Sequence, residues 1–137
     1  MAVQLRPMRD DEFAEWLPRL RDDYAQDMGS NEQAVFVIEA DGESAGTLWV
    51  ADRDEAEFRS LFVYELHVEE RYRGRGYGKA AMVLAEEEAR RRGIDCIALN
   101  VSGGNTVARN LYRSLGYDEN AVAMSKLLEE GRGADGA

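Results

Sequence analysis

The segment that most constrains this chain is a strand-like run that leads through a glycine-rich loop into a helix. Residues 60–68 (SLFVYELHV) have the β-branched and aromatic side chains typical of a strand. Residues 69–79 (EERYRGRGYGK) then place three glycines among four basic side chains, and in residues 80–92 glutamates precede arginines by four positions, as in a helix. Glycines let backbone N–H groups approach a ligand closely, and a helix N-terminus favours negative charge. The segment therefore predicts an anion-binding loop.

Five further apolar or alternating segments indicate strands, at residues 3–8, 33–40, 44–51, 95–101 and 121–128. Asp41-Gly42, between the second and third of these, is a hairpin signal, and the polar residues 51–58 predict a turn. In the strand at residues 60–68, alternation would place two sets of side chains on opposite faces: Phe62, Tyr64, Leu66 and Val68 on one, and Val63, Glu65 and His67 on the other.

Helical spacing appears in two further places. It covers residues 10–28, where Pro18 would kink or split the helix, and residues 106–115, where Asn105 is a suitable N-cap. Strands before and after each helix predict a mixed α/β sheet. We expect a single domain over residues 1–128 and a flexible tail over residues 129–137.

The charge of the chain is uneven. The net charge is −10, and the first 69 residues hold 17 acidic and 6 basic side chains. This imbalance suits a cationic ligand, although surplus acid can also serve only to keep a protein in solution. No basic surface is long enough to follow a nucleic-acid backbone, so we expect no nucleic acid as partner.

The remaining composition bounds the class of protein. The only cysteine, Cys96, excludes an internal disulfide, and no metal-ligand cluster is evident, so we expect no metal. Neither a leader-like N-terminus nor a membrane-length apolar run is present, which predicts a cytoplasmic protein with no membrane partner.

Three kinds of glycine-rich site could explain residues 73–79. A dinucleotide-binding turn requires the spacing G-x-G-x-x-G, whereas the chain has G-x-G-x-G. A P-loop requires Gly-Lys followed by Ser or Thr, whereas Lys79 is followed by Ala80. An Arg-Gly segment could bind RNA as a disordered tail, whereas this segment lies between a strand pattern and a helix pattern. What remains is a strand–loop–helix cradle for a phosphate or pyrophosphate.

Two motifs in this order resemble the GNAT superfamily of N-acetyltransferases. Arg73, Gly76 and Gly78 match its acyl-CoA-binding signature R/Q-x-x-G-x-G/A. Residues 105–117 (NTVARNLYRSLGY) are similar to its later segment N-x-x-A-x-x-L-Y-x-x-L-G-F/Y. The resemblance covers residues 61–127, about half of the chain. It implies a mixed, mostly antiparallel central sheet flanked by helices.

The resemblance implies that the anion is the pyrophosphate of acetyl-CoA. The residues it implies for binding are those of the loop, the preceding strand end and the later motif: Arg73, Gly74, Arg75, Gly76, Tyr77, Gly78 and Lys79; Leu66, His67 and Val68; and Asn105. In related proteins the strand before the loop separates from its neighbour at a bulge, so the N–H of Val68 is the expected oxyanion donor, and Leu66 to Val68 are expected to hold the pantetheine arm. Asn105 could also be only an N-cap.

Acetyl transfer to an amine requires a base for the amine and an acid for the departing thiolate. The resemblance makes Tyr112 the expected acid, although its spacing also fits an apolar helix face. Glu65 interrupts an apolar strand and is the expected base, with an ion pair, a solvated face or an acceptor anchor as alternatives. His67, the only histidine, is a reserve base.

The resemblance thus implies an acetyl-CoA-dependent N-acetyltransferase that attacks the donor directly with a primary amine, for which the charge favours a cationic molecule or a protein amine. The alternative is a non-catalytic domain that binds acyl-CoA as a sensor or complex subunit. Homodimers are common among similar proteins.

Overall fold

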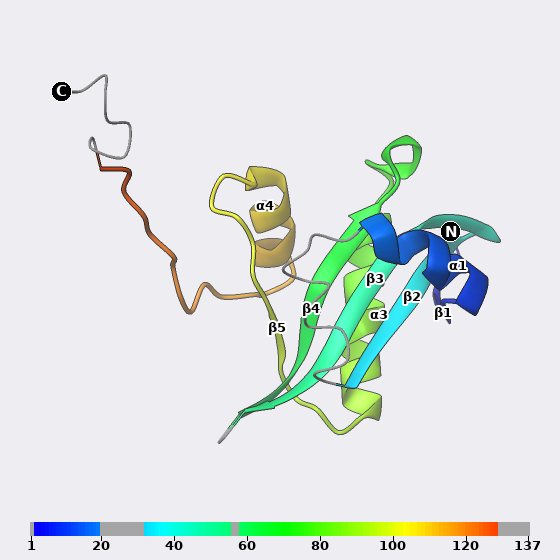
Figure 1. Cartoon of the computed structure of the whole chain (residues 1–137), viewed down its shortest axis with the longest axis horizontal. Helices are drawn as coiled ribbons and strands as arrows, with labels where there is room; N and C mark the ends of the chain where they lie inside the picture. The colour runs from blue at the N-terminus through cyan, green and yellow to red at the C-terminus, as the bar shows by residue number, and fades with distance from the viewer. Residues whose placement is uncertain (1, 20–31, 56–57, 129–137) are drawn as a thin grey trace. The chain divides into compact units, whose positions relative to one another are not determined.

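The computed structural model describes residues 2–19, 32–55 and 58–128, in two compact units that are considered separately, Met1–Asn105 and Thr106–Ala137. The elements of the first unit follow in the order β1 (Val3–Pro7), α1 (Asp10–Trp16), η1 (Leu17–Arg19), β2 (Glu32–Ala40), β3 (Glu43–Glu55), β4 (Phe58–Val68), η2 (Glu70–Tyr72), α3 (Tyr77–Arg91) and β5 (Ile97–Leu99) (Figure 1). The second unit contains α4 (Thr106–Ser114).

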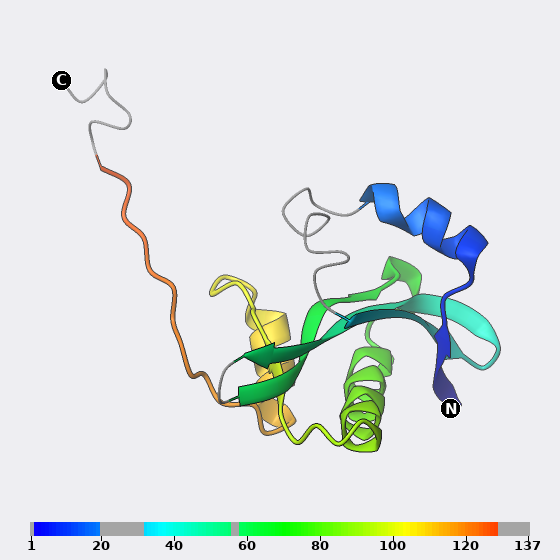
Figure 2. The same cartoon turned by 60° about the horizontal axis from the view of Figure 1, so that its bottom comes forward.

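The first unit is built on a five-stranded sheet in the order β1-β2-β3-β4-β5. Neighbouring strands are antiparallel except β4 and β5, which are parallel. Helices α1 and α3 lie on opposite faces of this sheet (Figure 2). The predicted mixed, mostly antiparallel sheet flanked by helices is therefore confirmed.

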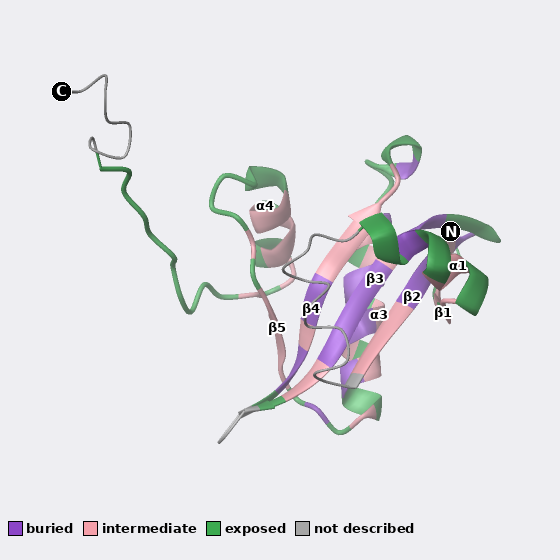
Figure 3. Cartoon of the chain, in the orientation of Figure 1, coloured by how far each residue is buried: buried purple, intermediate pink, exposed green. Residues whose placement is uncertain are grey.

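Strand β3 forms the centre of the core. Four consecutive residues, Leu48 to Ala51, are fully buried, so both faces of the strand are covered (Figure 3). Trp49 and Ala51 pack with Trp16 of α1 and with Tyr64. Leu48 and Val50, which alternate with them, point to the other face of the sheet. Helix α3 covers that face with its buried side chains, Ala81, Met82 and Ala85.

Local sequence signals explain several element boundaries. Asp41 and Gly42 both have positive φ, 52° and 83°, as expected of the tight turn between β2 and β3. Helix α3 ends before Gly93, which has φ 73°. The spacing of four predicts ion pairs of Glu86, Glu87 and Glu88 with Arg90, Arg91 and Arg92. The first and the third of these pairs form, whereas Arg91 contacts Glu88 instead of Glu87. No helix of the described ranges is long and apolar enough to cross a bilayer.

Two predicted elements were wrong and one was too long. Residues 121–128 form no strand, and the side chains of Val122 and Met124 are 71% and 90% exposed. An apolar pattern becomes a strand only where a neighbouring strand supplies hydrogen-bond partners. The predicted turn at residues 51–58 is mostly strand: β3 continues to Glu55, and Arg59 of β4 bonds across to Asp52 at 2.7 Å. Strand β5 has three residues, fewer than predicted. Helix α1 ends at Trp16 and η1 (Leu17–Arg19) follows, so the helix is split at Pro18 as predicted; residues 20–28 of the predicted helix lie outside the described ranges.

A β-bulge in β4 corrects the predicted alternation. Trp49 lies opposite Glu65, whereas the next residue, Val50, lies opposite Val63, so Tyr64 is an extra residue in β4. Glu65 therefore shares the α1 face of the sheet with Tyr64 and Trp49 instead of lying on the face opposite Tyr64. The resemblance implies a bulge at the end of this strand, near residues 66–68, but the actual position of the extra residue went unpredicted because residues 61–64 are all apolar and show no break in their pattern.

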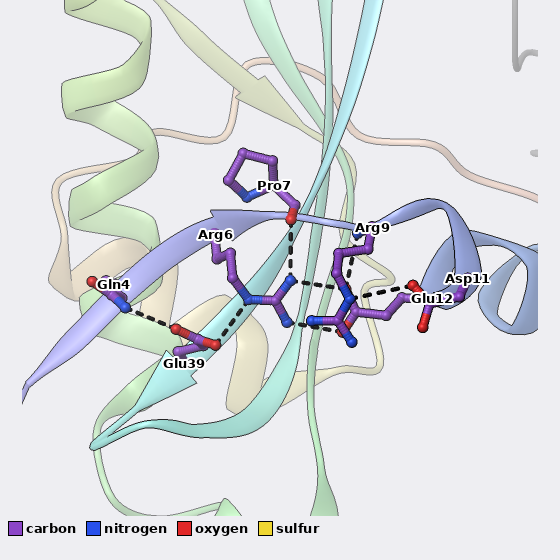
Figure 4. A network of polar contacts seen from close by, with 7 residues as sticks. All are labelled: Gln4, Arg6, Pro7, Arg9, Asp11, Glu12 and Glu39. Atoms are coloured by element: carbon purple, nitrogen blue, oxygen red, sulfur yellow. Dashed lines mark hydrogen bonds and ion pairs between the residues drawn. The ribbon is translucent and has the colours of Figure 1, made fainter.

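Arg6 of β1 fastens the first turn of α1 to the sheet (Figure 4). Its guanidinium donates two hydrogen bonds of 2.8 Å to the carboxylate of Glu12 and one of 2.8 Å to Glu39 of β2. Glu12 also accepts from the backbone N–H of Arg9, so it caps the helix at the same time. Arg6 lowers the pKa of the Glu12 carboxyl to about 2.

We expect Glu12→Gln to lower the free energy of unfolding at pH 7 by about 1 kcal/mol, since the pair is partly solvated. The pKa of Glu12 is lower in the folded chain than in the unfolded one, so its contribution is complete above about pH 4.5 and is lost as the pH falls towards 2. Urea unfolding from pH 7 to pH 3 should show the difference between the variant and the wild type shrinking. Glu15→Gln, which removes an exposed carboxylate of the same helix, is the control; an equal, pH-independent loss in both variants would contradict the prediction.

Candidate active site

The glycine loop leads into α3, and its first residue, Arg73, donates its N–H to the carbonyl of Glu70 at 3.2 Å. Gly74 and Gly76 have φ values of +80° and +82°, a region that other residues seldom adopt. Gly76 is the N-cap of α3 and provides no side-chain cap, and the first helical bond runs from the N–H of Ala80 to the carbonyl of Gly76. The N–H groups of the first helical turn, residues 77–79, thus have no partner within the helix, as a bound phosphate would require.

The loop also has room for such an anion. A Cβ atom placed on Gly74 or Gly76 would meet no heavy atom within 4 Å. The side chains of Arg75 and Lys79 are exposed beside this space. The residues present therefore fit a pyrophosphate held by backbone N–H groups.

The side chains of Arg73 and Tyr77, two further predicted binding residues, contact the protein itself. The Nε of Arg73 donates a hydrogen bond of 2.8 Å to the carbonyl of Val68, which fastens the loop to the end of β4. The side chain of Tyr77 is 6% exposed and packs against Tyr72, Ala40 and Ala45. Tyr77 can therefore contribute to ligand binding only through its backbone.

We expect Gly76→Val to weaken acetyl-CoA binding at least tenfold in a folded protein, because the branched side chain enters the space beside the α3 N-terminus. Gly93→Val is a matched control, since Gly93 also has positive φ, 73°, and open space, but lies at the other end of α3. Backbone strain of about 1–2 kcal/mol should destabilise both variants alike. Calorimetry should show the loss of affinity in Gly76→Val alone; equal affinities in the two variants would contradict the cradle.

The end of β4 turns backbone groups away from the sheet. The N–H of Glu69 donates to the carbonyl of Ala45, so Val68 and Leu66, one and three positions earlier, occupy the alternate positions of the antiparallel ladder. Their N–H and C=O groups point away from β3. On that side β4 pairs with β5 only as far as Val63 and Leu99. The N–H of Val68, the expected oxyanion donor, is therefore directed away from β3 and lies beyond the part of β4 that pairs with β5.

Gly46 in β3 is a residue that the sequence analysis did not single out. A Cβ atom here would lie 2.0 Å from the backbone oxygen of His67, so only glycine permits this approach of the two strands. An isolated glycine in an apolar strand was the available signal. A side chain at this position would push β3 away from His67 and Val68.

Glu65 lies at the edge of an aromatic cluster. Its carboxylate accepts a hydrogen bond of 3.4 Å from the indole Nε1 of Trp16. Trp16 meets Trp49 edge to face at 5.5 Å, and Trp49 stacks on Tyr64 at 4.5 Å. A half-buried carboxylate beside aromatic rings suits a cationic amine, through charge and through cation–π attraction.

His67 lies on the same face of β4 as Glu65, two residues further along the strand. Its side chain is 35% exposed, and its Nε2 is 3.8 Å from a carboxylate oxygen of Glu69. His67 is thus within reach of a solvent-borne acceptor. In the described part of the chain, no three His, Cys, Asp or Glu side chains group as metal ligands.

Tyr112 belongs to the second unit and is described there by itself. Partial burial on α4 raises the pKa of its phenol, which therefore keeps its proton at neutral pH. Its ring meets that of Tyr117 at 5.7 Å. Asn105, the last residue of the first unit, precedes α4 and donates its N–H to the carbonyl of Ser102. The structure thus gathers the loop, the β4 end and Glu65 in one unit and places Tyr112 in the other.

Solved structures with the same fold include acetyltransferases. The crystal structure of the Bacillus subtilis protein YycN superposes with a TM-score of 0.78 at 26% identity, over 93% of this chain and 99% of that one. A structure of AAC(6')-Iy in complex with the bisubstrate analogue CoA-S-monomethyl-acetylneamine has a TM-score of 0.71 at 20% identity, over 93% and 99% of the two chains. The latter likeness shows the fold alone.

Comparison of sequences identifies the family. The N-acetyltransferase YycN of Bacillus subtilis (strain 168), described as uncharacterized, is 39% identical over 83 residues, 61% of this chain and 53% of YycN. YdgE of the same strain, also described as an uncharacterized N-acetyltransferase, is 30% identical over 99 residues, 72% of this chain and 63% of YdgE. This chain therefore spans less than two thirds of the length of either relative. The model of the acetyltransferase (GNAT) family matches residues 3–117, and the chain belongs to that family.

Proposed function

We propose that the protein transfers an acetyl group from acetyl-CoA to a primary amine of a cationic acceptor, by direct attack in a ternary complex. One observation carries the proposal: the uncapped N-terminus of α3, with its open glycine loop, follows a strand end whose backbone groups turn away from the sheet. The names of the relatives YycN and YdgE, both N-acetyltransferases, support it. So does the fold shared with AAC(6')-Iy, whose structure holds a CoA-based bisubstrate analogue.

In this proposal the two parts of the first unit bind different portions of the donor. The N–H groups of residues 74–79 bind the pyrophosphate, since that of Arg73 already donates to the carbonyl of Glu70. The α3 dipole and the side chains of Arg75 and Lys79 add positive charge there. The outward backbone groups of residues 66–68 hold the pantetheine arm like an added strand. The side chain of Asn105 also serves this arm.

The chemistry is assigned to three groups. Glu65, directly or through water, takes a proton from the ammonium of the acceptor, and the nitrogen then forms its bond to the thioester carbon. The N–H of Val68 donates to the oxyanion that develops on the carbonyl oxygen. As the carbon–sulfur bond breaks, the hydroxyl of Tyr112 gives its proton to the departing thiolate, and the second proton that the nitrogen loses on becoming an amide restores this hydroxyl through water.

The acceptor is proposed to be cationic because Glu65 lies beside the ring of Trp16 on the α1 face and the first half of the chain is strongly acidic. A polyamine, an aminoglycoside or a protein amine would each fit this charge. Proteins with similar folds include AAC(6')-Iy and a ribosomal-protein-alanine N-acetyltransferase from Brucella melitensis biovar Abortus 2308. Their names span both small-molecule and protein acceptors.

Release of coenzyme A thiol from acetyl-CoA in the presence of an amine panel tests the proposal. An enzyme should release thiol only with an acceptor, and cationic amines should give the highest kcat/KM. Thermal stabilisation by acetyl-CoA without thiol release for any amine would instead support a non-catalytic acyl-CoA sensor or complex subunit. A homodimer and a cytoplasmic location are predictions for gel filtration and cell fractionation.

A further inference from the structure

An open hollow of about 230 Å³ lies beside the glycine loop, and of its lining residues only Arg75 has a part in the binding proposed above. It is lined by Glu43, Arg71, Tyr72 and Arg75. Glu43 is the first residue of β3, directly after the hairpin turn, whereas Arg71 and Tyr72 belong to η2 and Arg75 lies between the loop glycines. The hollow therefore joins the β2–β3 hairpin to the proposed phosphate loop.

Tyr72 is the fixed wall of this hollow. Its side chain is 6% exposed, and its ring packs against Ala40, Ala45 and Tyr77. Its hydroxyl donates a hydrogen bond of 2.8 Å to Glu43 and accepts one of 2.6 Å from Arg71. A buried ring with both hydroxyl functions satisfied has one defined position, so it can hold neighbouring side chains in place.

Two guanidinium groups gather on this ring. The Cζ atom of Arg71 lies 4.7 Å from the ring centroid of Tyr72, and that of Arg75 lies 5.5 Å away. Arg71 is also 3.5 Å from the carboxylate of Glu43. In the part of the chain that the structure describes, no carboxylate pairs with Arg75. Two positive charges thus face one negative charge, which leaves a net positive hollow in a chain of net charge −10.

The chemistry of the hollow selects the anion. Arginine guanidinium groups bind phosphate oxygens through paired N–H donors, and a phosphate monoester carries close to two negative charges at neutral pH. Coenzyme A has one phosphate outside its pyrophosphate, the monoester on the ribose 3′ carbon. Since the loop N–H groups are assigned to the pyrophosphate, the adjoining basic hollow is open to this third phosphate.

We propose that the hollow formed by Glu43, Arg71, Tyr72 and Arg75 is the subsite for the 3′-phosphate of coenzyme A. Arg75 is its main ligand, Arg71 is the second, and Tyr72 is the positioning residue that holds both. The subsite rests on the proposed function in that coenzyme A is taken as the donor. It would make the protein distinguish coenzyme A from dephospho-coenzyme A, which lacks only this phosphate.

Calorimetric titration with coenzyme A and with dephospho-coenzyme A tests the subsite. The wild type should bind coenzyme A at least tenfold more tightly than the dephospho form, the effect of one charge-assisted pair. Arg75→Gln should lose most of that preference: coenzyme A should bind at least tenfold more weakly, whereas dephospho-coenzyme A, which still presents its pyrophosphate to the loop, should bind only a few-fold more weakly. Arg90→Gln removes an exposed positive charge near the other end of α3 and should leave both affinities unchanged.

A second variant separates the subsite from general stability. Tyr72→Phe keeps the ring but removes the hydroxyl that joins Glu43 to Arg71, so coenzyme A should bind a few-fold more weakly and dephospho-coenzyme A should not. Equal losses for both ligands in Arg75→Gln, or no preference in the wild type, would overturn the subsite and leave the proposed function standing. Failure of the wild type to bind either ligand would instead contradict the proposed function.

Discussion

Replacement of Tyr112 by phenylalanine is expected to lower kcat by roughly 10²–10⁴-fold while the affinity for acetyl-CoA barely changes. The variant keeps the ring and its packing on α4 but removes the hydroxyl that would protonate the thiolate. Burial raises the pKa of this phenol, so the proton to be donated is present throughout the neutral range. Steady-state thiol release and calorimetry on the same preparation would measure the two quantities.

The neighbouring tyrosine offers a control for that experiment. Tyr117 contacts the ring of Tyr112 at 5.7 Å in the same unit, and Tyr117→Phe removes a hydroxyl of the same kind. Its kcat should remain within about twofold of wild type. A Tyr112→Phe variant that also stays within twofold on a good acceptor would show that the side chain serves only the apolar face of α4.

Replacement of Glu65 by glutamine should lower the rate most near neutral pH. The amide is nearly the same size as the carboxylate and can still accept the indole N–H of Trp16 through its oxygen, but it cannot take a proton. An acceptor amine with a pKa near 10 is mostly charged at pH 7, so the loss at that pH should be about 10²-fold or more. As the pH rises towards the pKa of the amine, the rate of the variant should partly recover.

His67→Gln is the matched control, because it alters the same face of β4 two residues away. It should have little effect if Glu65 is the base. A pH–rate profile for Glu65→Gln that parallels the wild type, with the loss found in His67→Gln, would transfer the role to the histidine. A rise in KM alone for Glu65→Gln would mean that the carboxylate anchors the acceptor instead.

Signals that depend on the backbone conformation of single residues were predictable from the sequence. Asp41-Gly42 turned the chain between β2 and β3 as expected, because two residues with positive φ are what such a hairpin needs. The glycine loop and the start of α3 followed from Gly74 and Gly76 for the same reason. These positions specify local geometry without reference to the rest of the molecule.

Features that depend on a partner elsewhere in the chain were not predictable. Gly46 is required by the backbone of His67, twenty-one positions later in the sequence. Glu43 and Tyr72 meet only because the hairpin brings β3 beside the end of β4. Residues 121–128 have an apolar pattern but no strand beside them, so the pattern alone overstated the sheet. Each of these depends on tertiary contacts that no short window of sequence contains.

The extra residue at Tyr64 reverses, for the rest of β4, which face of the sheet the odd-numbered residues occupy. Before it, odd-numbered positions such as Val63 belong to the α3 side, whereas after it odd-numbered positions such as Glu65 and His67 belong to the α1 side. Loss of one residue here would invert the orientation of every later side chain in the strand without altering a single proposed catalytic residue. An alignment of relatives that places a gap one position too early or too late within this strand would therefore pair Glu65, the proposed acceptor-facing carboxylate, with a core residue. An equivalent carboxylate in a relative would then be recorded as a substitution.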